Sequence, residues 1–271
     1  MSDEASDLER LVTAVQASSS CRMMCTDAIR NVGARELANR SSLREAIKGA
    51  KNKLHQIAGA YQEREPSYDT WASDLQAARQ SGDRSQFLAA CRRIMACHSS
   101  TCERLPILDQ FYATTLAGCG AIRSVLDLAC GLNPLAIPWM PLAADVTYHA
   151  CDIYRDMMAF LDACLRILGV SGDAQACDVL QTLPTQRVDV ALLLKIIPCL
   201  EQVDKLAGLR LLDNVNARFL LVSFPVRSLG GRSKGMPSHY EAHFRDLAAQ
   251  RTWAVQRFVF DTELAFLVEK S

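Results

Sequence analysis

Several common signals are missing from this 271-residue sequence. It has no net formal charge, because 30 Lys and Arg balance 30 Asp and Glu, so bulk charge does not indicate a nucleic-acid partner. No apolar run approaches the ~18 residues of a membrane span. The acidic start, Met1 to Glu4, has none of the apolar core of a signal peptide. We therefore expect a soluble, cytoplasmic protein with no membrane partner.

Two ligand-binding signatures are absent as well. No C-x-x-C pair occurs among the 11 cysteines, so Cys91, Cys97 and Cys102 with His98 are interpreted as ordinary packing residues and not as a metal site. The odd cysteine count and the missing secretory signal argue against a disulfide framework. Gly131 alone stands where a G-x-G-x-x-G fingerprint needs three glycines, which disfavours a nicotinamide or flavin cofactor. We expect reduced cysteines and no metal.

The sequence does contain a strand that runs into a small-residue turn, residues 124–134, SVLDLACGLNP. A continuous apolar run is typical of a parallel strand buried on both faces. Gly131 lets the backbone approach a ligand closely, and ligands of open α/β sheets lie at the carboxyl ends of such strands. The turn with Asp127, Ala129 and Gly131 is similar to the first motif of methyltransferases that use S-adenosyl-L-methionine (SAM).

The pattern of apolar residues changes near the middle of the chain. Residues 1–117 have helical spacing, whereas residues 118–271 alternate between strands and helices. We expect strands at 124–128, 146–151, 174–177, 188–194, 219–224, 254–260 and 263–269, with helices near 135–140, 154–168, 203–214 and 238–251. The last two are separated by Asp261 and Thr262 alone, which predicts a hairpin. The predicted fold class is therefore α/β, a Rossmann-like seven-stranded sheet with a C-terminal antiparallel hairpin, plus an N-terminal all-α domain of residues 1–117.

Basic residues concentrate in the N-terminal part. Between Arg22 and Arg64, nine Lys and Arg oppose four Asp and Glu, a net charge of nine minus four, or +5. One helix, expected from residue 41 to about residue 61, is apolar on one face and basic on the other. Its cations are Arg44, Lys48, Lys51 and Lys53. Such a face suits a phosphate backbone, and a solvated helix face is an equally good interpretation.

Acidic residues end the second and third predicted strands. Asp152 lies about twenty residues beyond the glycine turn, where an acid can accept hydrogen bonds from ribose hydroxyls. Asp178 is placed to accept from an adenine amino group, while Val179 packs on the ring. The alternative is that both acids simply end strands at the surface.

Cations follow the fourth and fifth predicted strands. Lys195 comes directly after an apolar strand, so it is either a surface charge or a site cation, and its position favours the site. Residues 226–236, VRSLGGRSKGM, combine three glycines with Arg227, Arg232 and Lys234. A loop of this kind can follow an RNA backbone; otherwise it is a solvated crossover.

These residues resemble a known family, the 16S ribosomal RNA guanine-N7 methyltransferases of aminoglycoside resistance (the Arm/Rmt and actinomycete producer group). The resemblance runs through most of the chain, at residue 98 and in segments 54–55, 59–61, 100–101, 103–105, 127–134, 151–153, 193–195, 198–201 and 223–236. The turn from Cys130 to Pro134 and the glycine-rich loop are its most specific parts. Cys102, where members often carry a basic residue, and the high cysteine content depart from the pattern.

The resemblance implies a SAM-dependent enzyme that methylates N7 of guanosine 1405 in the decoding A-site and confers aminoglycoside resistance. SAM would be the cofactor and S-adenosyl-L-homocysteine (SAH) the product. The N-terminal helical domain would dock on the assembled 30S subunit, and residues 118–271 would form the SAM-binding methyltransferase domain. We expect a monomer, because so large a substrate leaves little need for a dimer.

The expected roles fall into three sets. The cofactor set is Arg104, Asp127, Ala129, Gly131, Asp152, Ile153, Asp178, Val179 and Lys195, with Arg104 on the methionine carboxylate. The catalytic set, beside the target base, is Lys195 and Glu201. The rRNA set is Arg44, Lys48, Lys51, Lys53, Arg227, Arg232 and Lys234. His55 and His98 are more often structural residues in such positions.

Three other functions stay open at this point. A methyltransferase of another A-site position, such as adenine N1, would use the same cofactor motif. A ribosome-binding protein without turnover would tolerate loss of the pocket acids and Lys195. A small-molecule methyltransferase would not need a basic helix.

Overall fold

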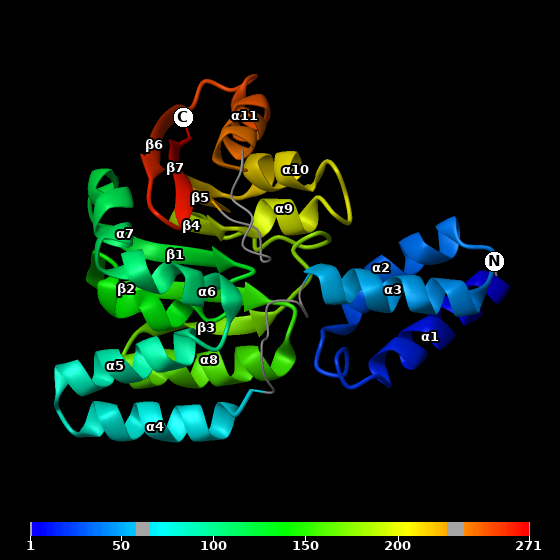
Figure 1. The fold of residues 1–271 in the computed structure, drawn as a ribbon, viewed down its shortest axis with the longest axis horizontal. Helices are drawn as coiled ribbons and strands as arrows, with labels where there is room; N and C mark the ends of the chain where they lie inside the picture. The colour runs from blue at the N-terminus through cyan, green and yellow to red at the C-terminus, as the bar shows by residue number, and fades with distance from the viewer. Residues whose placement is uncertain (1, 58–65, 227–235, 271) are drawn as a thin grey trace.

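The computed structural model describes residues 2–57, 66–226 and 236–270. Its centre is a seven-stranded sheet in the order β3-β2-β1-β4-β5-β7-β6 (Figure 1). The strands are β1 (Ile122–Leu128), β2 (Leu142–Asp152), β3 (Ser171–Ala176), β4 (Val188–Leu194), β5 (Ala217–Pro225), β6 (Ala254–Val259) and β7 (Glu263–Glu269). Strands β1 to β5 pair in parallel, and β7 is antiparallel to both β5 and β6. The predicted seven-stranded sheet with a C-terminal antiparallel hairpin is confirmed.

The inner strands are apolar throughout because helices cover both faces of the sheet. Successive residues of β1 enter two separate hydrophobic clusters, Val125 on one face and Leu126 on the other. The edge strand β3 is largely exposed or half-buried, and it begins at Ser171, three residues before the predicted start. Residues 171–173 have no apolar pattern, and they join the sheet by pairing with β2.

Helices lie on the two faces of the sheet in separate groups (Figure 1). One face carries α8 (Arg155–Leu168), with α4 (Tyr68–Gln80) and α5 (Arg84–Met95) packed outside it, and the short elements α6 (Ser99–Arg104), η2 (Leu105–Ile107), α7 (Leu108–Thr115), η3 (Ala117–Cys119) and η4 (Asn133–Trp139). The other face carries α9 (Ile196–Leu200), α10 (Ala207–Asn214) and α11 (Met236–Ala248). In the described part of the chain, no helix is long and apolar enough to span a bilayer.

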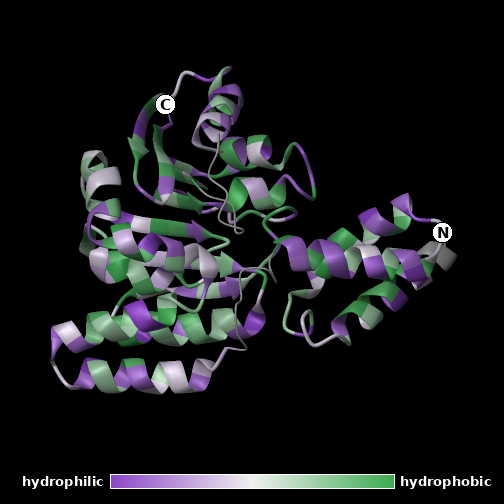
Figure 2. Ribbon diagram, viewed as in Figure 1, coloured by the Kyte–Doolittle hydropathy of each residue, from purple (hydrophilic) through white to green (hydrophobic). Residues whose placement is uncertain are grey.

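Three N-terminal helices form a lobe of their own beside the carboxyl ends of the strands (Figure 1). They are α1 (Ser2–Gln16), α2 (Thr26–Asn39) and α3 (Leu43–Ile57). In Figure 2 hydrophilic and hydrophobic residues alternate around α3, as expected for a helix with one packed and one exposed face. The backbone N–H of Cys25 donates to the carbonyl of Ile153 at 2.7 Å, which ties the lobe to the end of β2.

Helices α4 to α7 belong to the layer on one face of the sheet, where α4 packs on α8. Contacts of α5 and α7 with η4, and of α7 with β7, therefore cross the predicted division between residues 117 and 118. A domain boundary at that position stays a prediction.

Two predicted helices have different bounds in the structure. The helix expected at 135–140 is the 3-10 helix η4, with Pro134 at its start and Pro138 inside it. Proline cannot donate the backbone hydrogen bond that a regular α-helix requires there. The helix expected from residue 203 begins at Ala207, after a turn in which the Asp204 carboxylate accepts from the Leu206 N–H at 3.0 Å.

Candidate active site

A pocket lies at the carboxyl ends of the strands, where the strand order reverses between β1 and β4. Its empty space is about 800 Å³, part of it open to solvent. Strand ends and the turns after them contribute Ala129, Asp152, Ile153, Asp178, Val179, Leu180, Leu194 and Lys195. The N-terminal lobe contributes Ala28 and Val32 from α2 and Ile57 from α3. These three apolar residues were not predicted to face a pocket, because the spacing on a helix indicates burial but not the partner.

The turn after β1 is held in an uncommon backbone conformation. Ala129 and Gly131 both have positive φ, 49° and 51°. A Cβ atom on Gly131 would lie 2.6 Å from the ring of His98, so this position requires glycine. The Gly131 N–H donates to Asp152 Oδ2 at 3.0 Å. The predicted turn and the predicted acid are therefore one structural unit.

Asp152 shapes the turn and lines the pocket at the same time. Its other oxygen, Oδ1, accepts from the Ile153 N–H at 2.7 Å. Burial raises the pKa of Asp152, and the N–H groups of Gly131, Ile153 and Tyr154 oppose that rise. Backbone donors thus offset part of the cost of keeping this carboxylate inside the molecule.

Asp178 is buried in the pocket lining, shortly after β3. Its Oδ1 accepts from the Leu180 N–H at 3.0 Å, and its Oδ2 accepts from Asn31 Nδ2 at 2.9 Å. Val179, the next residue, is also buried and lines the pocket. Asn31 belongs to α2. Its contact with Asp178 was not predicted, because nothing in the sequence pattern of α2 indicates a partner in another part of the chain.

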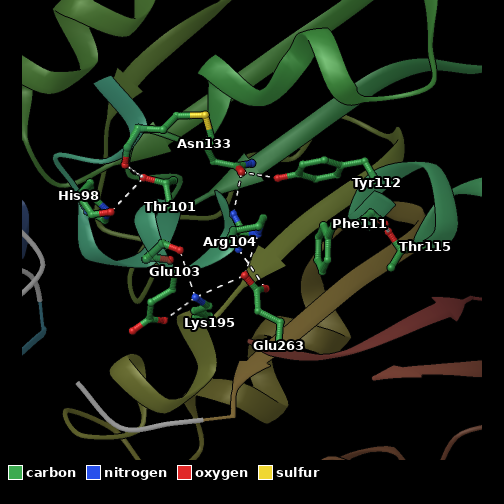
Figure 3. Close-up of polar contacts among 12 residues, drawn as sticks. His98, Thr101, Glu103, Arg104, Phe111, Tyr112, Thr115, Asn133, Lys195 and Glu263 are labelled. Atoms are coloured by element: carbon green, nitrogen blue, oxygen red, sulfur yellow. Dashed lines mark hydrogen bonds and ion pairs between the residues drawn. The ribbon is translucent and has the colours of Figure 1, made fainter. Parts of the chain in front are cut away.

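Arg104 lies deep in the protein, next to the pocket lining and not in it. Its side chain is 1% exposed and forms an ion pair with Glu263, with Nε and Oε1 2.8 Å apart (Figure 3). Nη2 donates to Glu263 Oε2 at 3.1 Å, and Nη1 donates to Asn133 Oδ1 at 2.9 Å. The expected contact of Arg104 with the methionine carboxylate stays a prediction, because in this structure the guanidinium has protein partners.

Lys195 lines the pocket from the residue between β4 and α9. Its backbone is left-handed, with φ of 61°, and its side chain is 5% exposed. Nζ donates to Glu103 Oε2 at 2.6 Å and to the Ser100 carbonyl at 3.1 Å, and it lies 3.3 Å from Glu263 Oε1 (Figure 3). The ammonium is thus a buried charge compensated by two carboxylates.

Glu263 connects these two cations, although no pattern in the sequence pointed to it. It is the first residue of β7, is 0% exposed, and contacts both Arg104 and Lys195. Burial alone would raise the pKa of Glu263, but the charges of Arg104 and Lys195 hold it below its usual value. Its position 159 residues after Arg104 left no local spacing that could have linked the pair.

Asp127 lies beneath the turn and does not line the pocket. Its Oδ2 accepts from Tyr148 Oη at 2.6 Å and from Asn133 Nδ2 at 2.8 Å, and Asn133 also accepts from the Tyr112 hydroxyl. Burial raises the pKa of Asp127 to about 6, although these two donors and Arg104 oppose the rise. Asp127 supports the turn through Asn133.

Of the two histidines considered in the sequence, His98 lines the pocket, packed against Gly131. Burial lowers the pKa of His98 to about 4, and the nearby charges of Lys195 and Arg104 act in the same direction. The ring is therefore neutral at pH 7. In contrast, His55 is exposed on α3.

Glu201 is outside the pocket lining. Its carboxylate accepts from His243 Nε2 of α11 at 2.8 Å and lies against Gly208 of α10. Lys195 and Glu201, the predicted catalytic pair, therefore point to different partners in this structure. A role for Glu201 at the target base stays a prediction.

The predicted rRNA residues divide into three groups. Arg44 and Lys48 are exposed on α3, and Lys51 is half-exposed one turn further along. Lys53 instead donates from Nζ to the Gln202 carbonyl at 2.9 Å, so it fastens α3 to the segment after α9. Arg227, Arg232 and Lys234 lie outside the described residues. Within residues 2–57, 66–226 and 236–270, no group of three His, Cys, Asp or Glu is placed to hold a metal ion.

Comparison with known proteins adds independent information. The family described as "Ribosomal RNA methyltransferase (FmrO)" matches residues 17–267. A 16S rRNA (guanine(1405)-N(7))-methyltransferase of Frankia casuarinae is 40% identical over 266 residues, 97% of this chain and 94% of the relative. A protein of the same name from Micromonospora rosea is 36% identical over 265 residues, 97% of each chain.

Solved structures agree with these relatives. The crystal structure of the 16S rRNA methyltransferase RmtF in complex with SAH has a TM-score of 0.83 at 33% identity, covering 97% of this chain and 98% of the other. The 16S rRNA methylase RmtB has a TM-score of 0.78 at 28% identity, with the same coverage. The resemblance inferred from the sequence is confirmed. With a family match over residues 17–267 and relatives aligned along nearly their whole length, the chain belongs to the ribosomal RNA methyltransferase (FmrO) family.

Proposed function

We propose that this protein transfers a methyl group from SAM to N7 of guanosine 1405 in 16S rRNA, within the assembled 30S subunit, and thereby confers aminoglycoside resistance. One observation carries the proposal: the pocket at the strand ends holds Asp152 and Asp178 in its lining, in a chain of this family. We also propose that the protein acts as a monomer.

The lining fits the chemistry of SAM. The half-buried carboxylate of Asp152 and the buried carboxylate of Asp178 offer acceptors for ribose hydroxyls and for the adenine amino group. Val179, Leu180, Val32 and Leu200 offer apolar surface for the adenine ring. When bound there, SAM supplies an electrophilic methyl group. Ala129 and Ile153 would complete its surroundings.

The reaction needs little acid–base chemistry from the protein. Guanine N7 carries a lone pair and no proton, so no residue has to act as a general base. The low pKa of His98, about 4, agrees with a pocket in which the histidine is a neutral packing residue. The chain's task is to orient the base and exclude water, and proximity and orientation then supply most of the rate.

Lys195 is the residue best placed to act beside the target base, because its buried ammonium belongs to the pocket lining. In this proposal Glu201 also acts beside the target base, once its carboxylate has released His243 and contacts the substrate. N7 faces the narrow major groove of an RNA helix, so the guanosine would be flipped out of its stack to reach the pocket.

Docking on the subunit is assigned to the N-terminal lobe. Arg44, Lys48 and Lys51 present positive charge on the outer face of α3, a helix that also reaches the pocket through Ile57. Arg227, Arg232 and Lys234 are proposed to hold rRNA near the reaction, on sequence grounds alone. The predicted division at residues 117 and 118 stays part of this proposal, with Ala28, Val32 and Ile57 of the first domain also lining the pocket.

The decisive experiment is primer extension on 16S rRNA from 30S subunits incubated with protein and SAM, after borohydride and aniline cleavage. We expect a new stop at nucleotide 1405 that disappears for the Asp178→Ala variant and persists for Asp173→Ala, a partly exposed acid of β3. A SAM-dependent stop elsewhere in the A-site would show that the enzyme methylates another nucleotide than 1405. Tight 30S binding without any methylation would indicate the non-catalytic alternative.

A further inference from the structure

A chain of side-chain hydrogen bonds runs along one edge of the pocket. It starts at the Asp178 carboxylate, passes through Asn31 and Arg35 of α2, and ends at Asp204, in the turn between α9 and α10. The three successive contacts measure 2.9, 3.2 and 3.0 Å. Three segments that are far apart in the sequence are joined in this way, and we call this chain the bridge.

The orientation of the Asn31 amide follows from its neighbours. Arg35 can only donate, and its Nε donates to Asn31 Oδ1. The amide nitrogen must then face Asp178, which can accept when ionised. The two contacts are therefore mutually consistent, and Asn31 cannot rotate its amide without breaking both.

Arg35 is anchored beyond Asn31 by two further contacts. Nη1 donates to the Val203 carbonyl at 3.3 Å, and Nη2 forms the ion pair with Asp204. Asp204 also accepts from Arg210 of α10 at 2.7 Å. Hydrogen bonds from Arg210, the Leu206 N–H and Arg35 hold the pKa of Asp204 at about 2, so this anchor is ionised at any ordinary pH.

The bridge stands beside residues that line the pocket in every segment it joins. Ala28 and Val32 flank Asn31 on α2, Val179 and Leu180 follow Asp178, and Leu200 precedes the Asp204 turn. A rearrangement of any one segment would change the shape of the cofactor pocket.

We propose that Asn31 and Arg35 are positioning residues of the cofactor site. They hold the carboxylate of Asp178 in the direction needed for the cofactor and fasten α2 across the pocket to the segment after α9. The inference rests on the proposed placement of SAM against Asp178. It assigns to the N-terminal lobe a part in cofactor binding, besides docking.

The first test measures SAH binding by calorimetry to the full-length protein. Asn31→Leu keeps the size of the side chain and removes the hydrogen bond to a charged acceptor. We expect the Kd for SAH to rise roughly ten- to hundredfold. The matched control is Asn39→Leu on the same helix, an exposed residue whose amide donates to the Arg35 carbonyl, where we expect a change within about twofold.

The second test separates positioning from general stability. Asp204→Asn removes the charge at the far end of the bridge, outside the pocket lining. We expect the KM for SAM to rise several-fold in both Asn31→Leu and Asp204→Asn while kcat at saturating SAM is kept. In the double variant, the two effects on SAH affinity should be less than additive, because both act through Arg35.

The inference fails if Asn31→Leu folds and binds SAH as tightly as the parent protein, or if Asn39→Leu weakens binding equally. If Asn31→Leu does not fold, unchanged SAH affinity in Asp204→Asn and Arg35→Met overturns it. SAH binding is measured without rRNA. The SAH result therefore does not depend on which nucleotide is methylated. Likewise, the methylation assay can support the proposed function even if this inference fails.

Discussion

Asp127 is a buried acid whose ionisation opposes folding. Its pKa is about 6 in the folded protein against an ordinary value of 3.8. Between these two values the folded state binds the proton more tightly than the unfolded state does. The contribution of this group to the free energy of unfolding therefore falls as the pH rises through this range, by about 3 kcal/mol over the whole titration.

The Asp127→Asn variant should not show this pH dependence. Relative to the parent protein, its free energy of unfolding should rise by about 2 kcal/mol between pH 4 and pH 7. Urea unfolding at a series of pH values gives the difference directly, and the comparison cancels the titration of other groups. Parallel curves for the two proteins would contradict the assignment.

Glu263 compensates two buried cations, so its charge should matter far more than that of a partly exposed acid on the same strand. Glu263→Gln leaves Arg104 facing Lys195 with one countercharge fewer, and we expect a loss of roughly 3–5 kcal/mol in unfolding free energy. Glu269→Gln, at the other end of β7, breaks a solvent-exposed pair with Arg218 and should cost at most about 1 kcal/mol.

Thermal and urea unfolding of the two variants test this contrast. Equal losses would mean that Glu263 contributes no more than a surface ion pair. An unchanged SAH affinity in a folded Glu263→Gln protein would confine its role to stability, and weakened affinity would extend that role to the pocket through Lys195.

Single residues were predictable from the sequence where a local pattern carried the signal. Asp152 and Asp178 were found because each follows the end of a predicted strand, and both line the pocket. Asn31 and Glu263 were not found, because each acts through a partner more than a hundred residues away. Asp127 was found by its motif, yet its place beneath the turn depends on hydrogen bonds from Asn133 and Tyr148.

Helix α3 carries cations in two different surroundings. Lys48 is exposed, whereas Lys53 reaches the Gln202 carbonyl. We expect Lys48→Ala combined with Lys51→Ala to weaken 30S binding and to flatten its dependence on salt, by about 0.7–0.9 in logarithmic slope for each phosphate that is no longer neutralised. Lys53→Met should change the salt slope less, because its ammonium already has a protein partner.

Binding of labelled protein to 30S subunits at several KCl concentrations measures both quantities. If Lys53→Met and the double variant had the same salt slope, the exposed face of α3 would not be the docking surface.

Secondary structure followed the sequence closely where the apolar pattern is strong and less closely where backbone geometry decides. Strands β4 and β5 contain the predicted ranges in full, because both are apolar and buried. The predicted helix after β1 became η4 because of Pro138. Helix α9 was not predicted, and it begins directly after Lys195, which adopts a left-handed backbone. Neither effect is visible in hydrophobic spacing.

At the scale of the whole molecule, the N-terminal lobe lines part of the cofactor pocket, although the sequence pattern indicated separate domains. Because α2 and α3 line the pocket, SAH and the 30S subunit should each raise the affinity of the protein for the other, by the same factor. We expect that factor to be at least about fivefold, the lower end of common coupling energies.

Two titrations check this reciprocity: SAH binding with and without saturating 30S subunits, and 30S binding with and without saturating SAH. If neither ligand changes the affinity for the other, the N-terminal lobe and the pocket are not coupled. The coupling should shrink in Asn31→Leu, since that variant breaks the bridge between them.

The pocket lining contributed by α2 also has a consequence for the design of inhibitors. A drug that merely imitates SAM competes with the cell's own cofactor and reaches every enzyme that binds SAM. A compound that binds against Val32 and Leu200 would instead contact a surface formed by the N-terminal lobe together with α9. If the lobe docks on the 30S subunit as proposed, such a compound should weaken ribosome binding by disturbing the contact between the lobe and the pocket, even where SAM is abundant.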